Sequence, residues 1–98
     1  RIWRMETQIR MISAATAVLE LRKHNPMAID EDVFQHVSDH IERAHIKEEK
    51  VKMAMIAAAD ETYKIARQNP KFSEKEILKE LMERIPLIVQ RIEENDNN

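Results

Sequence analysis

Three side chains on one predicted helix have a spacing that could bind a metal ion. Asp32, His36 and His40 recur every four residues, which places them along one side of a helix with the two imidazoles a turn apart. Zinc-binding helices use two histidines at this spacing. The positions 44 residues after the histidines hold Glu80 and Arg84, which are ordinary residues for a charged helix flank. We therefore expect His36 and His40 to be solvated and to bind no metal.

The other chemical patterns are incomplete. Glu42 and His45 form one Glu-x-x-His motif of the kind found in di-iron bundles, which need two such motifs, but the second half has Pro86 and Val89 instead. The serines are not spaced in a way that suggests a Ser-His-carboxylate set. Cys and Gly are absent, which excludes thiol nucleophiles, disulfides and glycine-rich phosphate loops. We expect no enzyme activity, no cofactor and no evident small-molecule substrate.

The segments that carry these residues repeat along the chain. When residues 1–44 are laid over residues 45–88 without a gap, eight of the 44 positions are identical, including Asn25-Pro26 over Asn69-Pro70. A self-match at a fixed offset defines a structural unit. Each unit here reads as a helix, an Asn-Pro break and a second helix, because proline disfavours the helical conformation in the preceding residue.

Apolar residues at three- and four-residue steps predict four helices. They cover about residues 2–23, a segment from residue 30, about residues 46–67, and a segment from residue 74. Asp30 is the expected N-cap of the second helix, and Ser73 with Glu76 forms a capping box for the fourth. The main stripe of the first helix is Ile2, Met5, Ile9, Ile12 and Leu19. The second helix is expected to bury Val33, Val37, Ile41 and Ala44, flanked by Phe34.

Two boundaries are less well marked. Residues 42–46 contain no Gly, Pro or Asn, so one helix over residues 30–67 is an alternative. The repeat favours a break there, because position 42 corresponds to Pro86. After Pro86, apolar residues continue, which indicates a short kinked or separate fifth helix.

These observations predict an all-α fold, with one domain over residues 1–98. We expect an antiparallel four-helix bundle made of two tandem helical hairpins, residues 1–44 and 45–88, related by a pseudo-two-fold axis. We also expect a short C-terminal extra helix after Pro86 and a C-terminal tail over residues 89–98. Because the chain opens on Arg1 rather than Met, we interpret it as a segment of a longer protein.

Charge and composition indicate the class of partner. The net charge is −2, with five basic against two acidic residues in segment 1–24, and five acidic against one basic in segment 25–44. Phosphate-binding proteins usually carry a basic excess. We therefore favour a non-catalytic, cytoplasmic protein-interaction or regulatory module that binds a protein partner or forms a homodimer, without a membrane span. The alternative is a nucleic-acid-associated regulator that uses the basic first helix.

The candidate interaction surface consists of apolar residues that the two hairpins leave over. It comprises Trp3, Leu87, Ile88, Val89 and Ile92. Such residues must either cover an open end of the bundle or face another chain, because exposing several of them lowers solubility.

Overall fold

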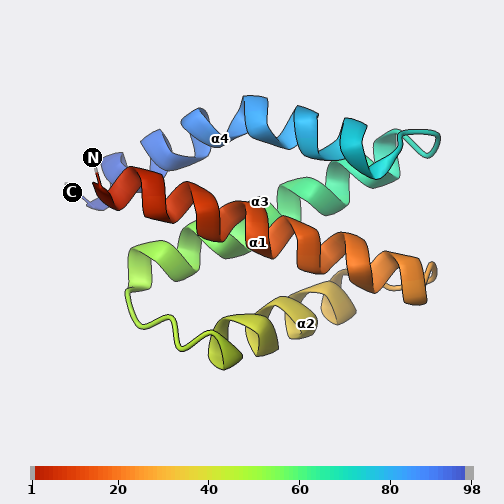
Figure 1. Ribbon diagram of the computed structural model, residues 1–98, viewed down its shortest axis with the longest axis horizontal. Coiled ribbons are helices and arrows are strands. Elements are labelled where there is room, and N and C mark those ends of the chain that lie inside the picture. The colour runs from red at the N-terminus through yellow and green to blue at the C-terminus, as the bar shows by residue number, and fades with distance from the viewer. Residues whose placement is uncertain (1, 97–98) are drawn as a thin grey trace.

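The computed structural model describes residues 2–96, and these residues form four α-helices without a β-strand (Figure 1). The helices are α1 (Ile2–His24), α2 (Asp30–Arg43), α3 (Glu49–Gln68) and α4 (Glu74–Asp96). The radius of gyration is 13.0 Å, close to the value of about 13 Å expected for a compact chain of this length. The all-α prediction is confirmed. Arg1 of the basic first segment and residues 97–98 of the tail lie outside the described residues.

The two helices α1 and α3 form the centre of the molecule and cross each other, with α2 and α4 on opposite sides of the pair (Figure 1). The contact between α1 and α3 is the most extensive, and within the described residues α2 does not touch α4. Small side chains allow the central helices to approach closely. Ala14 and Ala59 are buried on the α2 side of the pair, and Ala15 and Ala58 on the α4 side.

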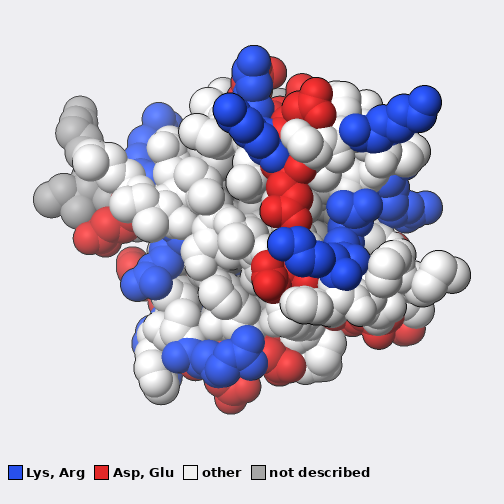
Figure 2. Space-filling model, turned by 45° about the vertical axis from the view of Figure 1, so that its right-hand side comes forward, with Lys and Arg blue, Asp and Glu red and all other residues white. Residues whose placement is uncertain are grey.

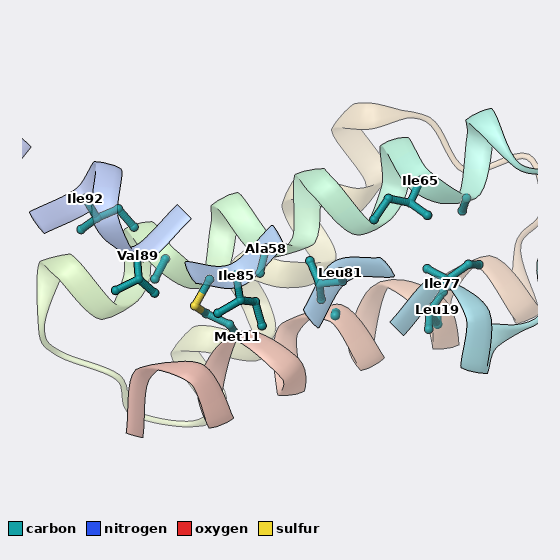
Figure 3. Packing of buried hydrophobic residues seen from close by; sticks show 12 residues of the cluster. Met11, Leu19, Ala58, Ile65, Ile77, Leu81, Ile85, Val89 and Ile92 are labelled. Carbon is teal, nitrogen blue, oxygen red and sulfur yellow. The ribbon is translucent and has the colours of Figure 1, made fainter. Parts of the chain in front are cut away.

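Two hydrophobic clusters hold the outer helices against this central pair. The cluster under α4 comprises Met11, Ala15, Leu19, Ala54, Ala58, Ile65, Ala66, Ile77, Leu81, Ile85, Val89 and Ile92 (Figure 3). The cluster under α2 comprises Ala14, Val18, Val33, Val37, Ile41, Val51, Met55, Ala59 and Tyr63. Full burial of a large apolar side chain contributes about 1.5–3 kcal/mol, so both outer helices are anchored by several such residues.

The helix starts include one confirmed prediction and one correction. Ser73 and Glu76 form the expected capping box: the Glu76 N–H donates to Ser73 Oγ (3.1 Å), and the Ser73 N–H donates to Glu76 Oε1 (2.8 Å). The assignment of Asp30 as an N-cap is wrong, because the cap of α2 is Ile29. The Ile29 N–H donates to Asp32 Oδ2 at 3.0 Å, which satisfies a helix-start donor and leaves Asp30 inside the first turn.

The predicted break between α2 and α3 is confirmed. The His45 N–H donates to the Glu42 carbonyl (3.1 Å), and the Ile46 N–H donates to the Ile41 carbonyl (3.3 Å). These two bonds form a Schellman motif, in which a residue with positive φ ends the helix. His45 has that role here with φ 58°, so the helix stops without the glycine that normally marks the position. α3 then begins at Glu49, three residues later than expected.

The predicted separate C-terminal helix is wrong, because α4 continues through Pro86 to Asp96. Proline lacks the N–H that would bond the Met82 carbonyl, and its ring crowds that carbonyl. Pro86 and Met82 are both exposed, so the disturbed turn faces solvent, and α4 bows away from the central pair (Figure 1). Val89 and Ile92 are buried beyond the proline, which keeps this last part of the helix on the core.

The predicted buried face of α1 is wrong in its first half. Met5 and Ile9 are exposed, whereas Thr7 is fully buried. At about 100° per residue, Thr7 lies on roughly the opposite side of the helix from Met5 and Ile9. The side that carries the alanines faces inward because it allows α3 to pack closely. The side chain of Ile2 is not among those described.

Candidate functional site

Two of the three residues with metal-like spacing make hydrogen bonds within the fold. Asp32 Oδ2 accepts the N–H of Ile29, the N-cap of α2, and His40 Nε2 lies 2.9 Å from Ser13 Oγ, which forms a hydrogen bond between α2 and α1. His36 and His40 are both partly buried rather than fully solvated, which corrects this part of the expectation. Among the described residues, no three His, Asp or Glu side chains are placed to hold a metal ion.

The electrostatic surroundings of His40 favour its neutral form. Burial lowers the pKa of His40, and the positive charges of Arg43, His36 and Arg10 lower it further. Burial and like charge both disfavour the imidazolium. The Ser13–His40 bond between α1 and α2 therefore lies in surroundings that disfavour a charged imidazole.

The five residues of the candidate interaction surface do not form one exposed patch. Val89 and Ile92 are buried in the cluster under α4, and Trp3 and Ile88 pack against that cluster. Leu87, which is 50% exposed, is the member that faces solvent. Val89 and Ile92 are thus not available to a partner, because their own chain covers them.

Polar contacts also close this end of the molecule. Arg4 donates two hydrogen bonds to the Glu93 carboxylate, with Nη2–Oε1 at 2.6 Å, and this pairing lowers the pKa of Glu93. The Lys50 ammonium lies 4.6 Å from the centre of the Trp3 ring, within the range of a cation–π contact. The starts of α1 and α3 and the end of α4 are therefore held together here.

An open apolar groove lies between α2 and α3, on a surface that the sequence did not indicate. It has a volume of about 410 Å³ and is lined by Asp30, Val33, Phe34, Val37, Met53, Ile56, Ala57, Ala59, Asp60 and Tyr63. We call this the α2–α3 groove. Phe34 is 57% exposed and Met53 is 47% exposed on its walls. Large apolar side chains that are exposed along a concave surface are typical of a binding site.

Local sequence explains the shape of the α2–α3 groove. Val33 and Val37 point into the core, while Phe34 follows Val33 by about 100° around α2 and stands at the edge. On α3, Ala57 and Ala59 are too small to fill the space between the helices. Tyr63 closes one end, and its hydroxyl donates to the Ala28 carbonyl at 2.8 Å.

The groove continues toward the far end of α2 as a more polar cleft. This cleft, of about 420 Å³, is lined by Ser38, Ile41, Glu42, His45, Ile46, Lys47, Lys52 and Ile56. Ile56 lines both spaces, so they adjoin. Glu42 and His45, considered above for a di-iron motif, lie at this end.

Asp30 and Asp60 are the charged residues that line the α2–α3 groove itself, and both lie toward its Tyr63 end. On the face of the molecule drawn in Figure 2, basic and acidic side chains lie next to one another. Asp30 and Asp60 stand on opposite helices and both line the groove. Asp60 pairs with Lys64 at 3.4 Å, whereas the Asp30 carboxylate makes no hydrogen bond or ion pair with any described residue. The groove therefore combines an apolar floor with an acidic rim formed by Asp30 and Asp60. Two cations lie beside this rim: Lys64, which pairs with Asp60, and Arg67, whose guanidinium lies 5.5 Å from the centre of the Tyr63 ring.

Comparison with protein-family models, with curated proteins and with solved structures finds no match to this chain. Within residues 2–96, none of the helices is both long and apolar enough to cross a membrane. The geometry of the surface is therefore the basis for any functional proposal.

Proposed function

We propose that this chain is a non-catalytic protein-interaction module that binds an amphipathic helix of another protein in the α2–α3 groove. The observation that carries the proposal is the apolar groove itself, with Phe34 and Met53 exposed on its two walls. Helix-in-groove recognition uses this arrangement, in which apolar side chains of the ligand fill a channel between two helices. Methionine adapts to ligands of different shape because its side chain is flexible.

The dimensions of the groove fit this mode of binding. α2 has 14 residues, which corresponds to a wall of about 21 Å at 1.5 Å per residue. A docked helix of about three to four turns would run along that wall and reach the polar cleft beyond Ile56. Its apolar stripe would contact Phe34 and Met53, with its polar face directed to solvent.

A titration with a designed peptide tests the proposal. The probe is a synthetic amphipathic helical peptide with a leucine stripe and glutamine at its other positions, followed by the amide resonances of the ¹⁵N-labelled protein. We expect shifts in residues 30–37 and 53–63, because these segments line the groove. A Phe34→Glu variant should lose binding because the peptide would have to bury a carboxylate.

Met82→Glu is the matched control. Met82 is 55% exposed on α4, compared with 57% for Phe34 on α2, so both substitutions place a carboxylate on an outer helix. The proposal requires Met82→Glu to bind the peptide like the wild type. No binding, or equal weakening by both variants, would show that the groove is not a helix-docking site.

We also propose that the chain consists of two equivalent hairpins, as the sequence repeat predicts. Support comes from the two turns. The Ala28 N–H donates to the Asn25 carbonyl at 3.0 Å, and the Phe72 N–H donates to the Asn69 carbonyl at 2.9 Å. Superposing the Cα atoms of residues 2–44 on those of residues 46–88 tests it. Hairpins that overlay in only one helix would reject the repeat.

The homodimer, the nucleic-acid alternative and the cytoplasmic location stay predictions. Sedimentation equilibrium of the wild type and a Leu87→Glu variant would test the dimer. Two cations of the first helix already form ion pairs with α4, Arg4 with Glu93 at 2.6 Å and Lys23 with Glu74 at 4.0 Å. We therefore place protein binding before nucleic-acid binding.

A further inference from the structure

We infer that the helix bound in the α2–α3 groove is basic at one end, with lysine or arginine beside its apolar stripe to meet Asp30 and Asp60. This inference rests on the proposed function and specifies the chemistry of the partner. It depends on the charges at the rim, which are independent of the apolar floor.

The two carboxylates are placed to act on a ligand that lies in the groove. Asp30 is on α2 and Asp60 is on α3, and both belong to the lining at the end closed by Tyr63. A docked helix would displace water from this end and lower the local dielectric. A carboxylate that loses water without gaining a partner costs free energy, and Asp30 has no partner among the described residues. A cation on the ligand removes that cost.

The same charges select against other ligands. An acidic helix end would bring like charges together at the rim, and specificity of this kind arises from repulsion as well as attraction. The rest of α2 adds to the effect, because segment 25–44 carries five acidic residues against Arg43. This field favours the approach of a basic partner at low salt.

The opposite end of the groove carries basic as well as acidic side chains. This difference in charge between the two ends would fix the orientation of a bound helix. The adjoining cleft is lined by Lys47 and Lys52 as well as Glu42, and Lys52 pairs with Glu49 at 3.5 Å. The acidic rim is therefore confined to the end that holds Asp30 and Asp60. We expect the basic residues of the partner to gather at the matching end of its helix.

The charges also disfavour one symmetric dimer formed through this groove. A two-fold interface places the same patch of both copies in contact. Two α2–α3 grooves that met in parallel would bring Asp30 and Asp60 of one copy toward the same pair in the other, whereas antiparallel grooves would bring them toward the end with Lys47 and Lys52. The charges therefore disfavour the parallel dimer, and sedimentation equilibrium tests the antiparallel one.

The experiment compares three synthetic peptides of about four helical turns with an identical leucine stripe. One end of the peptide carries lysine, glutamine or glutamate, and binding to the full chain is measured by fluorescence anisotropy at low and high salt. We expect the lysine peptide to bind about ten-fold more tightly than the glutamate peptide at low salt, from a few exposed charge contacts. The difference should shrink at high salt.

Two double variants locate the effect. Asp30→Asn with Asp60→Asn should abolish the preference for lysine. Glu31→Gln with Asp39→Asn removes the same charge from residues that do not line the groove, and it should keep the preference. If both double variants lose it equally, net charge rather than the rim is responsible, and the inference is overturned.

The outcomes separate the inference from the proposed function. If all three peptides bind equally and Phe34→Glu abolishes binding, the groove binds helices but the basic end is wrong. If no peptide binds, or if Phe34→Glu has no effect, both fail. Sedimentation equilibrium tests whether a second copy of this chain occupies the groove. If the wild type is a dimer and Phe34→Glu dissociates it, a second copy fills the groove and the inference is overturned.

Discussion

Replacing Thr7 by valine should stabilise the protein. Thr7 is 0% exposed, and its hydroxyl oxygen has no hydrogen-bond partner among the described residues. The hydroxyls of Thr16 and Thr62 instead donate to the carbonyl one turn earlier, at 2.9 Å to Ile12 and 2.7 Å to Ala58. Thr7 is therefore a buried polar group whose hydration is lost without compensation.

The expected gain in stability on Thr7→Val follows from the free-energy cost of burying an unbonded hydroxyl. A buried hydroxyl without a partner costs about 1–3 kcal/mol, and valine has nearly the same shape and helix propensity as threonine. The position 44 residues later already holds Val51, which is buried. We expect Thr7→Val to raise the free energy of unfolding by about 1–2 kcal/mol, or the midpoint temperature by about 4–8 °C per kcal/mol.

Urea unfolding followed by circular dichroism at 222 nm measures the change. Thr62→Val is the matched control, because Thr62 is equally buried but bonded. Thr62→Val should leave the free energy of unfolding unchanged or lower it by up to about 1 kcal/mol, because the substitution removes the hydrogen bond to the Ala58 carbonyl. If both substitutions shift the midpoint alike, or if Thr7→Val lowers it, the Thr7 hydroxyl has a partner in solution. The buried Trp3 Nε1, also without a partner and one turn away on α1, would be the first candidate.

Two further predictions concern histidines. His45→Gly should raise the free energy of unfolding by about 0.5–1 kcal/mol, because φ 58° strains any residue with a Cβ; a loss of stability in urea unfolding would mean that the imidazole makes a contact that outweighs the strain. Because the pKa of His40 is lowered in the folded state, the unfolded chain binds more protons below the ordinary value of about 6.5. The contribution of His40 to the free energy of unfolding should therefore be complete above that pH and should decrease as the pH falls below it. Unfolding curves at several pH values should show a smaller fall for His40→Gln, and equal falls would exclude His40 as the cause.

Local signals in the sequence were sufficient for the helices and for most of their ends. The Ser73 capping box depends on residues that are three apart, and the two Asn-Pro turns depend on neighbours. The break at His45 followed from the repeat rather than from a local signal, because a Schellman motif without glycine has no clear mark in the sequence. The predicted N-cap, Asp30, lies one residue after the observed cap, Ile29, whose N–H donates to Asp32 Oδ2 and so fixes the helix start one residue earlier.

Features that depend on how the helices pack were not predictable in the same way. α1 is apolar on two sides, so the spacing of Met5 and Ile9 did not reveal that the opposite side faces α3. The α2–α3 groove requires knowing that Phe34 and Met53, which are far apart in sequence, line the same channel. The sequence held a partial signal for the groove, because Met53 and Ile56 lie outside the sector of α3 that its alanines occupy.

The divergence of the two halves is informative about function. At the offset of 44 residues, Phe34 corresponds to Leu78. Leu78 packs against the cluster under α4, whereas Phe34 stays largely exposed beside the α2–α3 groove. A leucine that packs inward stabilises its helix, but an exposed phenylalanine adds little to stability and lowers solubility. Phe34 and Leu78 thus differ in role although they occupy corresponding positions. Leu78 packs α4 against the core, and Phe34 lines a groove with an acidic rim. This asymmetry, more than the apolar character of the groove alone, supports the proposal that a partner binds between α2 and α3 rather than on α4.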